Sequence, residues 1–181
     1  MDHNRNILIP LIMACLLSTA ALKAQPKAIS SLWSFSGIGI GYEHNLKDNS
    51  FIQFSIKTHL VRPFEDLSWT PDATLDFSWN MIFRQFRTSH GSDIFLFAGP
   101  GGMIGWTDDL KTPYGAVFGV KGRLGAECHF TRQVSIAMSI APVIGMHLSV
   151  NREGDYNMRT YRNGLIYDLL PELGIKYRFG R

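Results

Sequence analysis

The chain has 181 residues, which fits a single domain, and 45% of them are hydrophobic whereas only 18% are charged. This composition excludes a disordered chain, a collagen and a coiled coil. The charged fraction lies below the roughly 25% usual in soluble domains, yet no run of about 18 apolar residues exists that could form a transmembrane helix. A net charge of +3 without any basic run gives no reason to expect nucleic acid as a partner.

The N-terminal segment has the three-part order of a secretory signal peptide. A short polar start with Arg5 is followed by an apolar core at 7–17 and by mostly small residues up to Ala24. We therefore expect residues 1–24 to be removed as a signal peptide and residues 25–181 to form the mature domain. A buried N-terminal helix is the alternative.

The two cysteines bear on how the chain is exported. The residues before Cys15 make a loose lipobox, so a lipoprotein processed at Cys15 is a second alternative. If Cys15 leaves with the signal peptide, Cys128 is the only thiol that remains. An exported protein with one cysteine has no internal disulfide, so its stability must come from packing and backbone pairing.

Apolar and polar residues alternate through most of the mature chain, which predicts β-strands. In chain order the clear strands are expected at Gly37–Leu46, Phe51–Val61, Asp72–Phe86, Asp93–Trp106, Tyr114–Phe130, Gln133–Val150 and Gly164–Phe179. The longest alternation covers Val134–Val150, with apolar residues at even positions and mostly small residues at odd positions. Only Thr131–Arg132 separates it from the alternation before it, so a tight hairpin is expected there. The pattern between Asp93 and Trp106 is interrupted by Gly99–Gly102, and its faces are unclear.

Alternation alone does not say which face lies inside, because a soluble barrel buries its apolar face and a membrane barrel exposes it to lipid. Strand length favours the membrane, since these runs reach the about 9 to 11 residues that a membrane strand needs. The small residues Ser135, Ala137 and Ser139 suit a cramped lumen better than a solvated surface. On the last strand, Tyr167 and Phe179 share a face at a spacing that would place one at each membrane interface.

The distribution of charged residues also favours a membrane barrel. Strand parity assigns six positive and five negative side chains to the interior, a set that can pair internally. This expected lumen charge network consists of Glu43, Lys57, Asp76, Arg84, Lys121, Arg123, Glu127, Asp168, Glu172, Lys176 and Arg178. The sequence therefore predicts an all-β fold, an antiparallel transmembrane β-barrel of eight strands whose interior is filled by side chains. A soluble, lipocalin-like secreted barrel is the alternative.

Single-chain bacterial barrels have an even number of strands, so an eighth strand is needed. We expect it at Ile29–Phe35, because the apolar parity changes at Ser36–Gly37 and a turn there would separate two strands. One continuous strand with a β-bulge is the alternative. The short periplasmic turns are then expected at Leu46–Ser50, Arg87–Ser92 and Thr131–Arg132, and the outer loops at Arg62–Pro71, Thr107–Pro113 and Asn151–Asn163.

The chain resembles a known group in five segments: GIGIGYEHNL, FLFAGPGGMIGW, GVKGRLGAECHF, VSIAMSIAPVIGMHLSV and the closing LGIKYRF. Through these it resembles the small eight-stranded outer-membrane β-barrel proteins of Gram-negative bacteria. The resemblance implies an outer-membrane location and the barrel-insertion machinery as a partner. The group includes adhesion, stress-resistance and lipid-interacting members and a few lipid-modifying enzymes. The closing strand departs from the usual terminal aromatic residue, because Gly180 and Arg181 follow Phe179.

His147 and Ser149 are the sharpest catalytic candidates in the sequence. The pair is similar to the His-x-Ser pair of outer-membrane lipid A deacylases, in which a carboxylate orients the histidine. Glu153 or Asp155 could supply that carboxylate. Parity points His147 and Ser149 into the lumen, so we expect no enzymatic activity.

Metal and phosphate chemistry find little support in the sequence. Glu127 with His129, or Glu43 with His59, lacks an accompanying HExxH motif or cysteine cluster, so we expect neither a metal site nor a cofactor. The glycines at 99–102 lack the ending of a phosphate loop, and a kink in a strand is expected there.

The expected outer loop Asn151–Asn163 combines arginines with tyrosines. Its contact candidates are Arg152, Tyr156, Arg159, Tyr161 and Arg162. Arginine forks and nearby aromatic rings would suit the phosphates of lipopolysaccharide or an external ligand. An ordinary solvated loop is the alternative.

Together these features predict a monomeric, non-enzymatic outer-membrane β-barrel with a structural, adhesion or ligand-interaction role. Outer-membrane lipids are its expected partners, with lipopolysaccharide as a candidate. A lipid A-modifying hydrolase that uses His147 and Ser149, and a soluble lipocalin-like barrel, are the alternatives.

Overall fold

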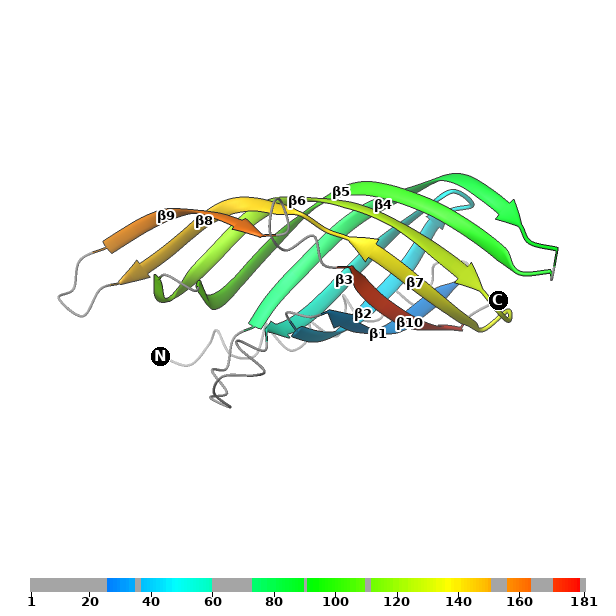
Figure 1. Cartoon of the computed structure of the whole chain (residues 1–181), viewed down its shortest axis with the longest axis horizontal. Coiled ribbons are helices and arrows are strands. Elements are labelled where there is room, and N and C mark those ends of the chain that lie inside the picture. The colour runs from blue at the N-terminus through cyan, green and yellow to red at the C-terminus, as the bar shows by residue number, and fades with distance from the viewer. Residues whose placement is uncertain are drawn as a thin grey trace, which may run out of the picture.

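The computed structural model describes residues 26–34, 37–59, 73–89, 91–109, 112–150, 156–163 and 171–179, and all its regular elements are β-strands (Figure 1). The strands are β1 (Lys27–Ser34), β2 (Gly37–Lys47), β3 (Ser50–His59), β4 (Ala73–Arg87), β5 (Asp93–Asp109), β6 (Thr112–His129), β7 (Val134–Ile140), β8 (Val143–Val150), β9 (Tyr156–Asn163) and β10 (Glu172–Phe179). No helix among these residues is long and apolar enough to cross a membrane. The expected signal peptide at 1–24 lies outside the described residues.

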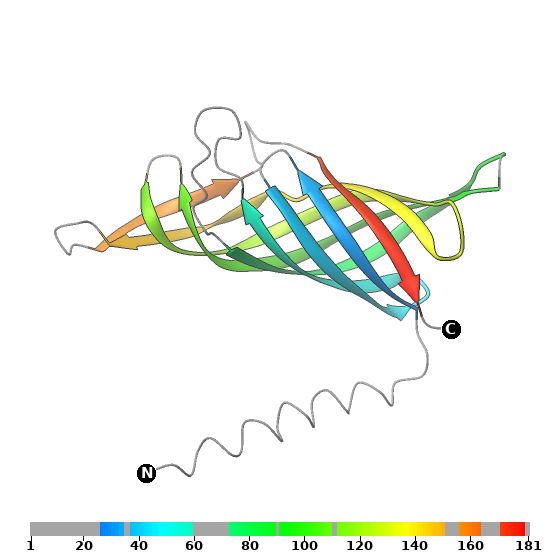
Figure 2. The same cartoon turned by 90° about the horizontal axis from the view of Figure 1, so that it is seen from below.

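The strands close into an antiparallel ring. Each strand from β1 to β6 pairs with the next, and β10 pairs with both β7 and β1, so eight strands complete the barrel. Figure 2 shows β10 lying beside β1, where the two ends of the sheet meet. The predicted eight-stranded antiparallel barrel is therefore confirmed.

β7 and β8 together form one long strand against β6. Leu124 lies opposite Ile140 and Lys121 opposite Val143, so the register is the same on both sides of the interruption. Pro142 causes the interruption because proline has no N–H to donate, while its carbonyl still accepts a hydrogen bond of 3.1 Å from the N–H of Gly122. This continuous strand corresponds to the alternation predicted over Val134–Val150.

The first strand is separate from the second. β1 and β2 pair antiparallel, with Ser34 opposite Gly37, so the chain reverses direction between them. This arrangement confirms the eighth strand expected near Ile29–Phe35 and excludes a single strand with a bulge.

The region after β8 differs from the prediction of one long outer loop. β9 pairs with β8 from Val150 opposite Tyr156 to Val143 opposite Asn163, so the second half of that loop is a strand. The last strand begins at Glu172, and residues 164–170 of its expected range, with Tyr167 and Asp168, lie outside the described residues.

The strand pairing also explains why a single alternation of apolar and polar residues does not continue from β9 to β10. Val143 of β8 lies opposite Asn163 of β9, and Ser139 of β7 lies opposite Glu172 of β10. Val143 and Ser139 are four residues apart in the chain, whereas Asn163 and Glu172 are nine residues apart. The five extra residues are an odd number, which reverses the parity: Met158 faces outward on β9, and Leu173 faces outward on β10.

The barrel carries its apolar residues outside and its polar residues inside. The buried side chains described comprise 18 polar or charged residues and only 8 hydrophobic ones, whereas residues such as Ile40 and Val120 are exposed on the outer wall. A soluble lipocalin-like barrel would bury the apolar face, so that alternative does not fit.

Glycines on the inner face of β5 allow the wall to curve tightly. Phe97 and Met103 face inward while Ile104 and Trp106 face outward, which settles the face that the sequence left unclear. Gly99 lies on the inner face, and a Cβ there would overlap the backbone carbonyl oxygen of Trp79 on β4. The two backbones approach this closely because the residue has no side chain.

We expect Gly99→Ala to lower the free energy of unfolding by about 2 kcal/mol or more, because the added methyl group would push β4 and β5 apart. A urea titration, followed by the mobility difference between folded and heated samples on a gel, measures the change. Gly122→Ala is the control, since nothing lies within 4 Å of a Cβ at that outward position. Equal losses in the two variants would contradict the close approach of β4 and β5.

Candidate functional site

Two ends of the barrel serve as reference points. At the turn end, the chain reverses at Asp48–Asn49, between Arg87 and Asp93, and between His129 and Val134, and β1 begins and β10 ends there. The opposite end is called the loop end. Two groups of charged side chains fill the lumen between these ends, and both are built from strands that are distant in sequence.

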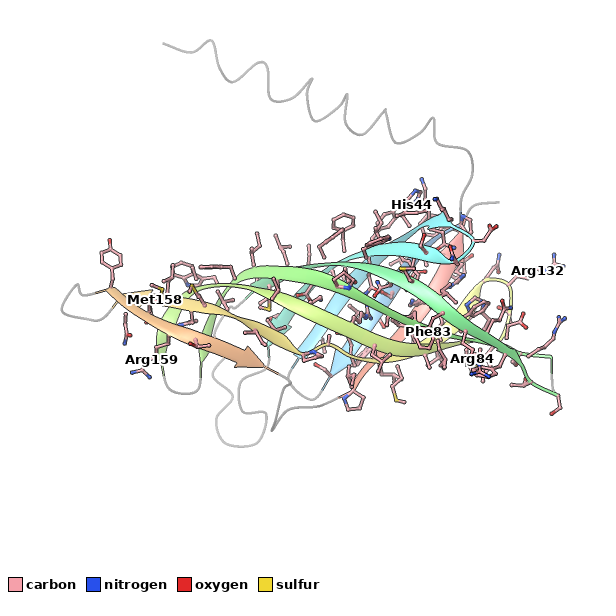
Figure 3. The ribbon with its side chains drawn as sticks, turned by 90° about the horizontal axis from the view of Figure 1, so that it is seen from above. His44, Phe83, Arg84, Arg132, Met158 and Arg159 are labelled. Atoms are coloured by element: carbon pink, nitrogen blue, oxygen red, sulfur yellow. The ribbon has the colours of Figure 1, made fainter. Side chains whose placement is uncertain are left out.

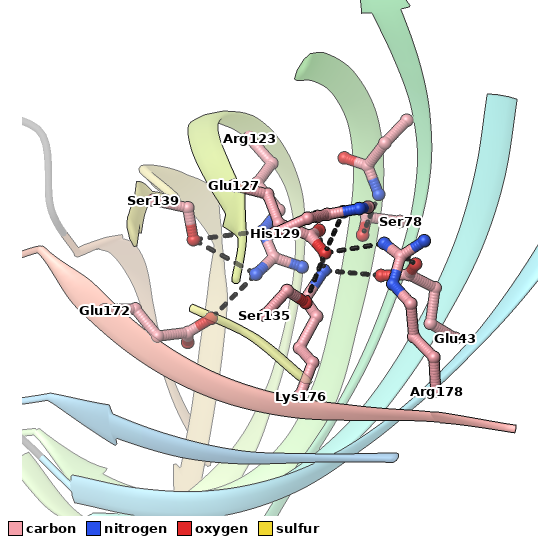
Figure 4. Close-up of polar contacts among 11 residues, drawn as sticks. Glu43, Ser78, Arg123, Glu127, His129, Ser135, Ser139, Glu172, Lys176 and Arg178 are labelled. Atoms are coloured by element: carbon pink, nitrogen blue, oxygen red, sulfur yellow. Dashed lines mark hydrogen bonds and ion pairs between the residues drawn. The ribbon is translucent and has the colours of Figure 1, made fainter. Parts of the chain in front are cut away.

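The turn-end cluster is centred on Lys176 of β10, whose side chain is only 1% exposed. Its Nζ lies 2.5 Å from Oε2 of Glu43 on β2 and 2.7 Å from Oε2 of Glu127 on β6 (Figure 4). Arg178 adds a second cation, with Nη2 at 2.5 Å from Oε1 of Glu127 and 3.6 Å from Oε1 of Glu43. Two cations and two carboxylates thus share one buried network.

Two further side chains complete the surroundings of Glu127. The hydroxyl of Ser135 donates a hydrogen bond of 2.6 Å to Oε1, and Nε2 of His129 lies 2.9 Å from the same oxygen. The ring of His129 also contacts that of Phe95, with centroids 4.5 Å apart. The Glu127 and His129 pair considered from the sequence as metal ligands is therefore occupied by contacts within the cluster.

The loop-end cluster joins three cations to two carboxylates. Nζ of Lys57 lies 3.0 Å from Oδ2 of Asp76 and also contacts Glu172. Lys121 approaches the same Asp76 oxygen at 3.3 Å, and Nη2 of Arg123 donates to Oε1 of Glu172 at 3.0 Å. Ser139 accepts a hydrogen bond from Nη2 of Arg123 at 3.0 Å.

An aromatic pair connects the two clusters. Phe97 has no exposed surface, and its ring meets that of Phe51 edge-on at 5.3 Å between centroids. The guanidinium of Arg123 lies 5.5 Å from the Phe97 centroid and the ammonium of Lys176 lies 5.7 Å from it, so one ring contacts a cation of each cluster. Cation–π attraction of this kind is stronger in a desolvated interior.

The interior is therefore a packed polar core and not an open channel. Five cations face four carboxylates within the described lumen, and all nine take part in ion pairs: Lys57, Lys121, Arg123, Lys176, Arg178, Glu43, Asp76, Glu127 and Glu172. Burial of a charge is tolerated only where it is paired and hydrogen-bonded. The paired charges stabilise the packed interior.

One predicted member of the lumen network, Arg84, is not found there. Arg84 is exposed on β4, because the register shifts between Ile82 and Arg84 and the extra residue, Phe83, reverses the parity. Asp168 lies outside the described residues. The sequence also missed the aromatic pair, since the face of Phe97 was unclear; its position two residues before the inward Gly99 is the signal that could have placed it.

The catalytic candidates His147 and Ser149 lie on the inner face of β8. Their exposed fractions are 1% and 2%, and Oγ of Ser149 has no hydrogen-bond partner among the described residues. Glu153 and Asp155 lie outside the described residues. A deacylase would require that a lipid of the outer leaflet can reach the His147 and Ser149 pair. Both side chains are buried on the inner face, away from the outer wall.

The outer-loop candidates that the structure describes lie on β9, in the hairpin at the loop end. Tyr156 is 90% exposed, and Figure 3 shows Met158 and Arg159 on the same strand, projecting in different directions. Arg152 and the side chains of Tyr161 and Arg162 lie outside the described residues, as does the side chain of His59. Two exposed contact candidates, Tyr156 and Arg159, are thus brought together on one strand.

We expect Lys176→Met to lower the free energy of unfolding by about 3 to 5 kcal/mol, because it leaves Glu43 and Glu127 buried with less positive charge. Arg87→Met is the matched control, since it breaks an exposed ion pair with Asp93 at 3.6 Å and should cost less than about 1 kcal/mol. Urea titration of folded samples measures both. Adding Glu43→Gln to Lys176→Met should recover part of the loss, and a fully additive double variant would argue against the coupling.

Comparison with known proteins supports the fold. The sequence matches no protein-family profile and no curated protein. The N-terminal β-barrel domain of OprF from Pseudomonas aeruginosa is similar in structure, with a TM-score of 0.52 and 11% identity over 87% of this chain and 98% of that one.

Two further structures are less similar. Neisserial surface protein A matches with a TM-score of 0.40 and 13% identity over 86% of this chain and 94% of that chain. Ail, the attachment invasion locus protein of Yersinia pestis, matches with a TM-score of 0.34 and 13% identity over 87% and 100%. The closed ring of eight strands and the similarity to the OprF domain show that the chain has the fold of the small eight-stranded outer-membrane β-barrel proteins.

Proposed function

We propose that this protein is a monomeric, non-enzymatic barrel of a Gram-negative outer membrane, with a sealed lumen and a contact surface at the loop end. The packed lumen is the observation that carries the proposal. Because the two charged clusters and the Phe51–Phe97 pair fill the interior, the barrel serves to hold its loop end at the membrane surface and not to conduct solutes.

The outer wall supports insertion into a bilayer. Large apolar side chains are exposed on every strand of the ring, among them Ile29, Ile40, Ile56, Leu75, Ile104, Val120, Met138 and Ile175. Barrels of this kind place short turns in the periplasm and longer connections outside. The turn end is therefore assigned to the periplasm and the loop end to the cell exterior.

The hairpin of β8 and β9 is the proposed contact surface. Within the described residues β9 pairs with β8 alone, so its second edge has no partner strand. Exposed Tyr156 and Met158 supply apolar area on one face of β9. Arg159, which lies opposite the inward-facing His147, supplies a guanidinium suited to phosphate on the other face. We propose that this surface contacts lipopolysaccharide in the outer leaflet.

A purified, refolded sample should show no large and stable conductance in a planar lipid bilayer, because the paired charges close the lumen. The mobility difference between unheated and heated samples on a gel serves as the control for folding. Long-lived openings of a size typical of diffusion pores, in a sample that passes this control, would overturn the sealed barrel.

Replacement of Arg152, Arg159 and Arg162 by Gln should weaken retention of lipopolysaccharide in detergent micelles by about tenfold or more, since each cation near a lipid surface contributes about 1 kcal/mol. Retention is measured by native mass spectrometry or co-sedimentation. A charge-matched control replaces Lys47, Arg87 and Arg132 at the turn end by Gln. Unchanged retention in the first variant, or the same loss in both, would contradict a loop-end site.

A further inference from the structure

The β-bulge on β4 near the turn end changes what the outer wall presents. β4 and β5 pair in one register from Ala73 to Ile82, and the register then shifts by one residue, so that Arg84 lies opposite Leu96. Phe83 is the extra residue, and it is 58% exposed. Because an extra residue reverses the alternation of faces, Arg84 is turned from the lumen side to the outward side.

Arg84 is a cation on an otherwise apolar wall. Its guanidinium lies over the ring of Phe86, with 5.0 Å from Cζ to the ring centroid. Arg87, by contrast, has Asp93 at 3.6 Å, whereas no carboxylate among the described residues pairs with Arg84. A cation on the lipid face costs about 2 to 4 kcal/mol at mid-bilayer and little near the interface. The last five residues of β4 are all exposed and the pairing with β3 ends at Met81, so Arg84 lies on the part of β4 that extends past β3. A position at headgroup level or beyond is therefore where Arg84 is tolerated.

Other exposed cations surround the same end of the barrel. We use the name basic collar for Lys47, Arg84, Arg87 and Arg132, all of which are exposed at the turn end. The carboxylates described at this end outside the lumen are Asp48 and Asp93, so positive charge exceeds negative charge. Phe83, Phe86 and Phe130 are exposed at this end, as in the aromatic girdle of a membrane interface. Figure 3 labels Phe83, Arg84 and Arg132 at this end of the barrel.

We propose that the basic collar binds the phosphates of phospholipid headgroups in the leaflet at the turn end, with Arg84 as its central contact. The guanidinium fork matches the oxygens of a phosphate, and the contact with Phe86 holds it at the edge of the apolar wall. The outward position of Arg84 on the wall favours a lipid. A periplasmic polymer would meet the tips of the turns instead.

This inference rests on the membrane orientation given by the proposed function. It assigns a different lipid to each end of the barrel, phospholipid at the turn end and lipopolysaccharide at the loop end. The two assignments depend on different arginines and can fail separately.

The test counts lipids retained by the folded protein in native mass spectrometry, with dioleoyl phosphatidylglycerol as the probe and dioleoylglycerol, which lacks the phosphate, as the reference lipid. Arg84→Gln should weaken phosphatidylglycerol retention about fivefold, as expected for one interfacial cation, and leave dioleoylglycerol unchanged. Arg84→Lys should retain much of the binding, because it keeps the charge and loses only the fork. Arg62→Gln, in the outer loop expected at Arg62–Pro71, is the matched control and should retain phospholipid as the unmodified protein does.

The outcomes that overturn the inference are distinct. Unchanged retention in Arg84→Gln, or an equal loss in Arg62→Gln, would remove Arg84 from the site. Loss of binding to soluble peptidoglycan fragments with unchanged phospholipid retention would assign the collar to the cell wall. Every variant is first checked for the heat-dependent gel shift. Absence of that shift in the unmodified protein would refute the membrane barrel itself.

Discussion

A closed ring of eight strands leaves each side chain one of two surroundings, a narrow interior or the outer wall. The interior has too little room for water to hydrate separate charges, so every charged group placed there needs an opposite charge within reach. The ion pairs meet this requirement across the ring. Glu43 on β2 reaches Lys176 on β10, and Asp76 on β4 reaches Lys121 on β6, although neither pair of strands is hydrogen-bonded. These contacts join parts of the ring that backbone pairing leaves independent.

The alternation of apolar and polar residues at every second position was sufficient to predict most of the fold. It indicated the strands, their number and the side on which the polar residues lie, because each strand of a barrel repeats the same choice between two faces. It also predicted the nine charged residues that the structure brings together in the lumen.

Two predictions about the described residues differ from the structure. The bulge at Phe83 moves Arg84 to the outer face, and residues 156–163, which were expected within an outer loop, form β9. The alternation of apolar and polar residues in one sequence cannot reveal such a bulge. A bulged strand and a straight strand can have similar sequences and differ only in how their residues pair with those of the neighbouring strand. The Phe51–Phe97 contact was missed for a related reason, since the glycines and proline of β5 hide its parity.

The hairpin of β8 and β9 stands apart from the closure of the ring. Among the described strands, β9 is bonded to β8 alone, while the circle is completed through β7, β10 and β1. Changes in the length or composition of this hairpin therefore alter neither the strand number nor the stagger on which closure depends. The loop end can vary from one relative to another, or accept a foreign peptide, while the barrel below continues to anchor it; the molecule is in this sense a display scaffold.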